Sequence, residues 1–250
     1  MRAAILPRRA HPVTDAVAAA DLRVGGLVPF TTTDFPGKLA AVVFCQGCPW
    51  RCRYCHNPHL LPPRGVRPEL EWAGVLEWLD TRRGLLDAVV FSGGEATAQE
   101  AVVAAMEAVR ARGFAVGLHT AGIYPRRLER LLRLVDWIGL DIKAPAADYA
   151  PVTGVALSGA PAFASLELLL RHPVPFEVRT TVHAKLTPAA LLRALAAELA
   201  ARGVQRWMLQ PFRATGCRDE ALNTSASLDA GLTPALVAEL SRVMPDIVVR

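Results

Sequence analysis

The sequence predicts an α/β fold built on a parallel sheet, and two observations lead to this prediction. Short apolar runs alternate with segments in which apolar residues recur at helical spacing, from Leu22 onward. The apolar runs are nearly continuous, which is typical of parallel strands covered by helices. Six strand–helix repeats are too few for a closed eightfold barrel, so an open doubly wound sheet and an incomplete barrel both fit the pattern.

The six predicted strands are short runs dominated by apolar residues. In chain order they lie at residues 39–45 (LAAVVFC), 87–92 (DAVVFS), 114–120 (FAVGLHT), 137–143 (WIGLDIK), 176–183 (FEVRTTVH) and 206–211 (RWMLQP). Polar or glycine-rich residues lie at the end of each run. In a doubly wound sheet and in a barrel alike, chemistry collects at the carboxyl ends of the strands, so these ends hold the candidate site residues.

Helices are predicted between the strands because apolar residues recur there at helical spacing, as at Leu128, Leu131 and Leu132. Prolines stand at several expected first turns, and glycines follow two expected ends. The helices are predicted at residues 69–81, 98–112, 125–135, 162–171, 188–202 and 234–244, with Pro125, Pro188 and Pro234 at first turns and Gly113 and Gly203 after the ends.

Composition excludes several classes of protein. Of the 250 residues, 52% are apolar and 20% are charged, which rules out a disordered or fibrous chain. No apolar run approaches the ~18 residues of a membrane span, so no membrane partner is expected. The 28 basic residues outnumber the 23 acidic ones only slightly, which favours a solvated, arginine-rich surface over nucleic-acid binding.

We predict one domain over residues 25–250, preceded by a loosely ordered N-terminal extension over residues 1–24. The extension is rich in Ala, Arg and Pro, and Pro7, Arg8 and Arg9 interrupt the apolar centre that a secretory signal needs. We therefore expect a cytoplasmic protein.

The cysteines are unevenly distributed. Cys45, Cys48, Cys52 and Cys55 fall within eleven residues, and Cys217 stands alone. Such clustering in a chain with a good core indicates a metal or cluster loop in a reducing compartment. The spacing Cys48-x3-Cys52-x2-Cys55 lets three thiolates ligate three irons of a cubane and leaves the fourth iron open, as a catalytic site requires.

The alternative is a four-cysteine zinc site that also uses Cys45. Zinc-binding pairs are usually separated by a longer span than the one between Cys48 and Cys52. Cys45 also ends a predicted buried strand, where a cysteine behaves as a small hydrophobe. The three-cysteine interpretation is therefore the favoured one.

The cysteine spacing, with Tyr54 before the last cysteine, resembles the signature of the radical S-adenosylmethionine (SAM) enzymes. The stretch TTTDFPGKLAAVVFCQGCPWRCRYCHNP is similar to the activating enzymes of glycyl-radical enzymes, and most like activators of anaerobic ribonucleoside-triphosphate reductase. The resemblance runs from about residue 25 to residue 216. It implies a partial (β/α)6 TIM-like barrel of the radical SAM type and two cofactors, SAM and a [4Fe–4S] cluster on Cys48, Cys52 and Cys55.

The resemblance also implies residues that bind SAM. Gly93, Gly94 and Glu95 match the family's glycine motif for the amino group of SAM, although Ala96 replaces the usual proline. Taken alone, this motif is usually a turn. Asp141 and Lys143, which share one face of a strand, would line the pocket near the methionyl carboxylate, and each could equally be part of a surface ion pair. The implied set is completed by Thr120 at the end of the third strand and by Arg179 as a carboxylate clamp, with a solvated strand-end arginine as the alternative.

Two positions depart from the activator pattern. His119 stands where relatives often have an acidic residue, which puts a cation proposed there in doubt. Arg213 stands where relatives have a histidine, so its contact with the cofactor is open. His56 is a candidate donor to cluster sulfur, and Asp34 matches a family position near the substrate backbone, although an Asp-initiated turn explains it equally well.

The implied activity is an oxidoreductase reaction. A flavodoxin- or ferredoxin-like protein would reduce the cluster, SAM would be cleaved to methionine and a 5′-deoxyadenosyl radical, and the radical would take hydrogen from a glycine of the partner enzyme. Anaerobic ribonucleotide reductase is the expected partner, with pyruvate formate-lyase or another glycyl-radical enzyme as the alternative.

Two other functions compete with this interpretation. One is a small-molecule radical enzyme of the 7-carboxy-7-deazaguanine synthase type, and the other is a non-catalytic iron–sulfur or zinc module. His56, Asn57 and Pro58 after the last cysteine favour an activator.

Overall fold

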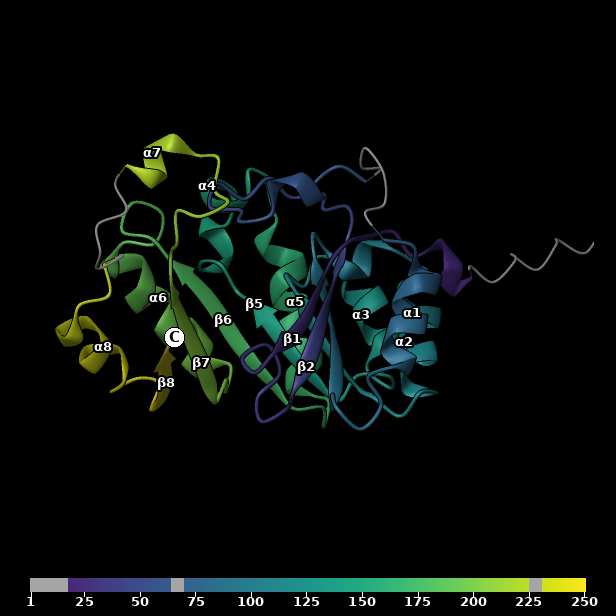
Figure 1. Cartoon of the computed structure of the whole chain (residues 1–250). Helices are drawn as coiled ribbons and strands as arrows, with labels where there is room; N and C mark the ends of the chain where they lie inside the picture. The colour runs from purple at the N-terminus through teal and green to yellow at the C-terminus, as the bar shows by residue number, and fades with distance from the viewer. Residues whose placement is uncertain (1–17, 64–69, 225–230) are drawn as a thin grey trace, which may run out of the picture.

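The computed structural model describes residues 18–63, 70–224 and 231–250. Their strands form one sheet in the sequential order β1 to β8 (Figure 1). All neighbours from β2 to β8 are parallel, and β1 is antiparallel to β2. The strands are β1 (Val24–Thr31), β2 (Ala40–Cys45), β3 (Ala88–Gly93), β4 (Ala115–Thr120), β5 (Trp137–Asp141), β6 (Phe176–Val182), β7 (Arg206–Pro211) and β8 (Asp246–Val249).

The sheet is a barrel that does not close. Among the described strands, β1 and β8 are the two edges, each hydrogen-bonded to one neighbour. The predicted partial barrel is therefore confirmed, and the open side between β1 and β8 is termed the seam below.

The six predicted strands correspond to β2 to β7, and the last of them matches residue for residue. The sequence patterns missed the two edges. The strand β1 was not predicted because it contains Gly25, Gly26 and Pro29. Glycine and proline are depleted in strands, and proline is tolerated only at an edge. The four residues of β8 are too few to stand out as a strand.

Among the residues that the structure describes, six helices cover the outside of the sheet, close to the predicted positions (Figure 1). Pro125 and Pro234 open two of them, and Gly113 and Gly203, each with positive φ, follow the ends of two others. Two short helices at the carboxyl rim, α4 (Ala150–Thr153) and α7 (Glu220–Asn223), were not predicted. The six are α1 (Trp72–Asp80), α2 (Val102–Arg110), α3 (Pro125–Leu131), α5 (Gly159–Leu170), α6 (Ala189–Ala201) and α8 (Pro234–Leu240).

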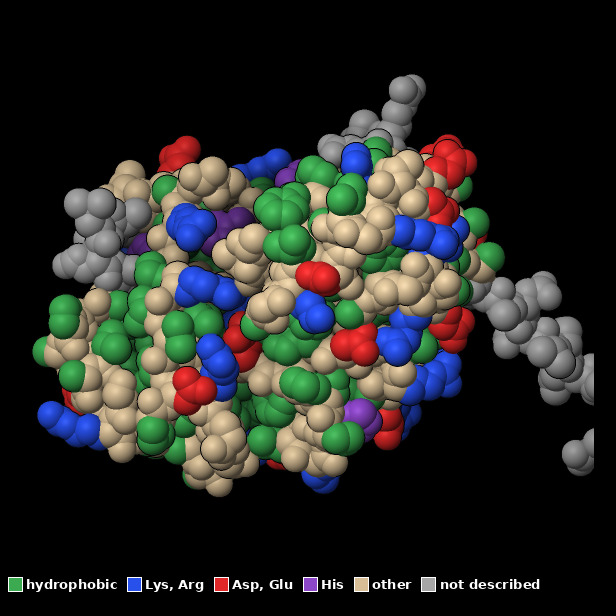
Figure 2. All heavy atoms as spheres, turned by 60° about the horizontal axis from the view of Figure 1, so that its bottom comes forward, with side chains coloured by type: hydrophobic (Ala, Val, Ile, Leu, Met, Phe, Trp, Pro, Cys, Tyr) green, Lys and Arg blue, Asp and Glu red, His purple; other side chains and the backbone are tan. Residues whose placement is uncertain are grey.

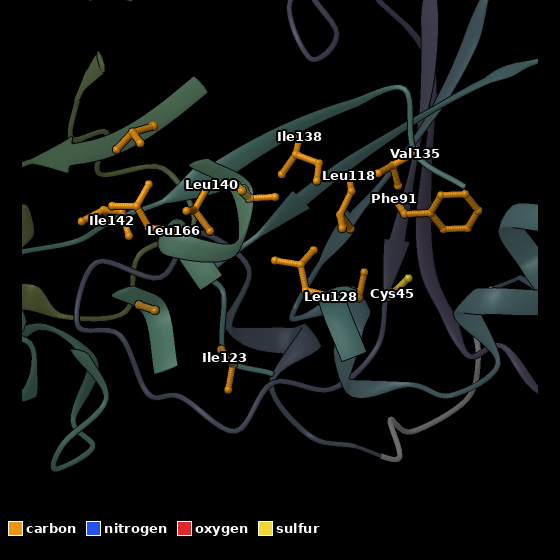
Figure 3. Packing of buried hydrophobic residues seen from close by; sticks show 14 of the residues in the cluster. Cys45, Phe91, Leu118, Ile123, Leu128, Val135, Ile138, Leu140, Ile142 and Leu166 are labelled. Carbon is orange, nitrogen blue, oxygen red and sulfur yellow. The ribbon is translucent and has the colours of Figure 1, made fainter. Parts of the chain in front are cut away.

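The two faces of the sheet are buried in different ways. Outward-facing residues such as Phe91, Leu118 and Ile138 pack against the helices in one large cluster (Figure 3). Inside the barrel, a smaller cluster around Phe35 and Trp137, with ring centroids 5.5 Å apart, fills the amino ends of the strands. The lumen is therefore plugged at one end, and its free volume lies toward the carboxyl rim.

Residues 18–24 form a single 3-10 turn, η1 (Ala19–Asp21), and the start of β1, with Leu22 and Val24 buried in the core. The rest of the predicted N-terminal extension, residues 1–17, lies outside the described residues. Positive and negative side chains are interspersed on the face shown in Figure 2. Within the described ranges, no helix has the length and apolar character needed to cross a membrane.

Candidate active site

The loop that follows β2 brings three cysteines to one cavity. Cys48, Cys52 and Cys55 all line a space of about 170 Å³ at the carboxyl rim. Short helix α4 fixes the outer side of this loop, because Arg51 N donates to Thr153 O (2.8 Å) and Arg53 N donates to Val152 O (3.0 Å). The loop therefore holds its thiols toward the lumen with backbone hydrogen bonds, before any metal is considered.

The other two cysteines lie elsewhere. Cys45 is fully buried and packs with the outward-facing cluster near Phe91 and Leu118, on the helix side of the sheet (Figure 3). Cys217 is buried outside the cavity lining, with its Sγ donating to Arg53 O at 3.4 Å. All five cysteines are unpaired thiols.

Burial governs the acidity of the three loop thiols. It raises the pKa of Cys48 to about 12 and also raises the pKa of Cys52 and of Cys55, while nearby Lys143 acts in the opposite direction. In the metal-free protein they are thiols, so a metal centre must displace their protons. Within the described part of the chain, no group of three or more His, Cys, Asp or Glu side chains is arranged to hold a single metal ion.

Gly93 and Gly94 form the wall of the cavity next to the cysteine loop. A Cβ at Gly93 would lie 2.3 Å from Cys45 N, and one at Gly94 would lie 2.5 Å from Gly47 O. Gly93 also has a φ of +115°. Only glycine permits this contact between β3 and the cysteine loop, so the cavity wall here is bare backbone.

Glu95 does not line the cavity. Its side chain is 1% exposed and turns into the protein, where it accepts hydrogen bonds from Thr97 N and Oγ1 (3.1 and 2.6 Å), Thr120 Oγ1 (2.7 Å) and Ala121 N (2.9 Å). Its backbone N donates to Gly47 O at 2.9 Å. Burial raises the pKa of Glu95, and the four donors act against that rise. Glu95 thus ties the cysteine loop, the glycine turn and the end of β4 together.

Asp141 and Lys143 meet as the strand alternation predicts. Lys143 Nζ lies 3.0 Å from Asp141 Oδ2 and 5.5 Å from the ring centre of Tyr54. Burial acts to lower the pKa of Lys143, but the interactions with Asp141, Tyr54 and Cys52 together outweigh it, so this pKa is raised well above the usual range. Both side chains line the cavity with the cysteines, as Thr120 does.

Arg179 lies apart from this group. It lines a second, adjoining cavity of about 360 Å³, not the cysteine cavity. Its Nε donates to Glu177 Oε1 at 2.9 Å, and its guanidinium lies 4.8 Å from the Trp137 ring centre. Gly139 makes room for it, since a Cβ there would lie 2.6 Å from Arg179 Cζ.

The positions left open by the sequence meet at the boundary of the two cavities. His56 lines both, and its Nε2 lies 2.9 Å from Arg213 O. His119 lines the first, and its Nε2 lies 2.8 Å from Asp34 O and 2.9 Å from Arg179 Nη1. Burial, followed by the charge of Arg179, holds the pKa of His119 well below its usual range, so the ring is neutral. Asp34 and Arg213 line the second cavity.

Sequence reasoning missed several lining residues. Thr181 lines both cavities, and its place two residues after Arg179 on β6 could have revealed it. Ser92, just before the glycines, also lines the first cavity, as do Trp50 and Asn57 in the cysteine loop. Asn57 was singled out only as part of the His56-Asn57-Pro58 segment, and nothing in the sequence distinguishes Trp50 from a packing residue.

Comparisons with known proteins agree with this arrangement. The chain is 36% identical over 125 residues to "Putative glycyl-radical enzyme activating enzyme MJ1227" of Methanocaldococcus jannaschii, covering 48% of this chain and 50% of the relative. It is 33% identical over 143 residues to a pyruvate formate-lyase-activating enzyme of Clostridium pasteurianum, covering 55% and 59%. The chain spans about half the length of the curated relatives it matches.

Two solved structures share the fold at low identity. QueE from Escherichia coli has a TM-score of 0.52 at 14% identity, covering 92% of this chain and 93% of its own. SuiB of Streptococcus suis bound to the precursor peptide SuiA has a TM-score of 0.60 at 10% identity, covering 82% and 47%. The model of the radical SAM superfamily matches residues 42–196. The chain therefore belongs to the radical SAM superfamily.

Proposed function

We propose that this protein is an activating enzyme that cleaves SAM reductively and generates a glycyl radical on a partner enzyme. The observation that carries the proposal is the meeting of three thiols, a bare glycine turn and the Asp141–Lys143 pair at one cavity. The names of the relatives, which are glycyl-radical and pyruvate formate-lyase activating enzymes, support the same function.

The superfamily uses a [4Fe–4S] cluster and SAM. The donor set fits this cluster, because three thiols supply three of the four ligands that a cubane takes. The cavity wall also indicates that a further group binds here: Tyr54 lines the cavity and is 5% exposed, and its buried hydroxyl has no hydrogen-bond partner among the described residues. We assign the cluster to Cys48, Cys52 and Cys55.

We assign the binding of SAM to the residues around the cysteine loop. The backbone of Gly93 and Gly94 would receive its amino group, and Lys143 would pair with its carboxylate, oriented by Asp141. Thr120 would contribute through its backbone, since its hydroxyl is committed to Glu95. Arg179 lines the second cavity and not the cysteine cavity, so we assign it to the second cavity.

A cluster held by Cys48, Cys52 and Cys55 would supply the one-electron reduction needed to cleave SAM, which the protein's own side chains cannot provide. The chain's own residues position and enclose the reactants. The Phe35–Trp137 plug seals the amino end of the lumen, and such closure matters because a primary carbon radical attacks any nearby C–H bond.

For the partner we propose a glycyl-radical enzyme, most specifically anaerobic ribonucleotide reductase, with pyruvate formate-lyase as the alternative. The seam between β1 and β8 supports a macromolecular substrate, because an open barrel admits a peptide loop that a closed one would exclude. A flavodoxin or ferredoxin in the cytoplasm would supply the electron.

Electron paramagnetic resonance tests this function. The reduced protein is mixed, without oxygen, with SAM and either purified anaerobic ribonucleotide reductase or pyruvate formate-lyase. We expect a glycyl-radical doublet on the reductase. A doublet only on pyruvate formate-lyase would redirect the partner assignment, and SAM cleavage with no protein radical on either enzyme would favour a small-molecule substrate.

A further inference from the structure

The second cavity is built from both edges of the open barrel. Thr33 and Asp34 follow β1, Arg250 follows β8, and Gln210, Pro211 and Arg213 lie at the end of β7. It adjoins the cysteine cavity through His56 and Thr181, which line both. A chain that enters through the seam would therefore pass this cavity on its way to the cysteines.

Guanidinium groups outnumber side-chain carboxylates around this space. Arg179, Arg213 and Arg250 line it. Glu177, buried beneath, lies 2.9 Å from Arg179 and 3.9 Å from Arg250, and it is also 3.8 Å from Arg206. The side-chain carboxylate of Asp34, which also lines the cavity, accepts a hydrogen bond from Thr31 Oγ1 at 2.6 Å. Within the described residues, no carboxylate lies within ion-pair distance of the Arg213 guanidinium.

Arg179 has hydrogen-bonding capacity that the protein does not use. Its side chain is 5% exposed, and its Nη2 is buried without a hydrogen-bond partner among the described residues. Its Nη1 shares His119 Nε2 with the carbonyl of Asp34, and that single nitrogen can accept from Arg179 or donate to Asp34, but not both. A buried, charged donor without an acceptor is costly, so a ligand that brings an acceptor is favoured here.

We infer that the second cavity binds a carboxylate, and that this carboxylate belongs to an acidic residue of the partner polypeptide, close in sequence to the glycine that loses hydrogen. A guanidinium and a carboxylate make paired, charge-assisted hydrogen bonds. The position at the seam favours a polypeptide over a free acid. This inference rests on the proposed function and adds a specificity rule to it: the cysteine cavity holds the chemistry, and the arginine cavity selects the segment.

Short peptides test the rule. Each carries one glycine with deuterium on Cα, and a single aspartate is placed at each flanking position in turn, with asparagine at the same position as the control. The reduced, cluster-loaded protein is given SAM and one peptide, and the deuterium found in 5′-deoxyadenosine is divided by the SAM cleaved. We expect one aspartate position to exceed its asparagine control by about tenfold, the gain typical of one charge-assisted contact.

Variants locate the effect. Arg213→Gln and Arg250→Gln are expected to reduce the aspartate advantage to less than about twofold. The matched control Arg133→Gln replaces an exposed arginine on the outer helix layer, paired with Glu107 at 3.4 Å, and is expected to keep the advantage in full. Because the ratio is taken per SAM cleaved, a change in cleavage alone does not alter it.

The outcomes separate the two claims. SAM cleavage with equal deuterium transfer from aspartate and asparagine peptides at every position overturns the carboxylate site and leaves the proposed function standing. An advantage that survives in both arginine variants also overturns it. Absence of 5′-deoxyadenosine with every peptide overturns the proposed function itself, and the inference with it. In a further arm, tight binding of free succinate that Arg213→Gln removes would assign the cavity to a small acid and contradict the polypeptide assignment.

Discussion

The two cavities at the carboxyl rim differ in how far their charged and polar groups are paired within the protein. The cysteine cavity has a backbone wall and paired charges: Lys143 is matched by Asp141, and Glu95 satisfies four donors behind the wall. The arginine cavity has more guanidinium groups than carboxylates and a buried donor without a partner. We interpret this contrast as follows. The charged groups of the cysteine cavity are already paired within the protein, as suits a resident cofactor, whereas the arginine cavity lacks an acceptor that a partner would supply.

The largest effect is expected from substitutions of the cysteines that line the first cavity. Replacing Cys48, Cys52 or Cys55 with alanine removes one of three cluster ligands, and we expect iron content and SAM cleavage to fall to background. Iron and sulfide analysis with chromatography of 5′-deoxyadenosine measures both. Cys217→Ala, outside the cavity lining, is the matched control and should retain cluster and activity. Full iron content in Cys52→Ala would contradict the ligand assignment.

The wall of this cavity depends on Glu95. In Glu95→Ala, the donors of Thr97, Thr120 and Ala121 lose their acceptor in a buried site. We expect the free energy of unfolding to drop by about 3 kcal/mol, as measured by urea denaturation. Glu95→Gln keeps the shape and most acceptor positions and should lose about half as much. Affinity for SAM, measured by equilibrium dialysis, should weaken in both, although neither replaces a residue that contacts the cavity. An unfolding free energy unchanged in Glu95→Ala would contradict the role of Glu95 in holding these segments together.

His119 connects the two cavities and gives a pH signature. Its pKa is lowered in the folded protein. Below about pH 6.5, this histidine is therefore protonated in the unfolded chain but remains neutral in the folded protein. This histidine's contribution to stability is therefore complete above that pH and is lost as the pH falls. The loss is up to about 1.4 kcal/mol per pH unit relative to His119→Gln, measured by urea denaturation at several pH values. Parallel pH profiles of the two proteins would contradict a neutral His119 in the folded protein.

The smallest effect is expected from a substitution at Cys45. This variant tests whether Cys45 is a core residue or a metal ligand. Cys45→Ala removes one buried sulfur on the helix side of the sheet and should lower the free energy of unfolding by about 1 kcal/mol. Its iron content and SAM cleavage should equal those of the unaltered protein. Loss of the metal centre in this variant would support a four-cysteine site.

The sequence patterns predicted the scaffold better than the site. The strands β2 to β7 are continuous apolar runs, so their existence could be predicted locally. The edges β1 and β8 could not, because glycines, a proline and short length conceal them. The cysteine spacing predicted that three thiols act together, and in the structure Cys48, Cys52 and Cys55 line one cavity.

The contacts that decide the roles of Glu95 and Arg179 were beyond sequence reasoning. Glu95 was predicted among the cofactor contacts, yet it turns toward Thr120 and Ala121, which lie 25 and 26 residues away. Arg179 was predicted to clamp SAM; its guanidinium contacts Glu177 and His119, the latter 60 residues away, and it lines the second cavity. The hydrogen-bond partner of a charged side chain depends on the three-dimensional packing around it. The sequence pattern does not reveal that packing.

The central claim is a cluster with one iron that the protein leaves free for SAM. Mössbauer spectroscopy of protein loaded with iron-57, recorded with and without SAM, tests it most directly. We predict that one iron in four changes its signal when SAM is added and that the other three do not. Four irons that remain equivalent and unchanged in the presence of SAM would contradict the account.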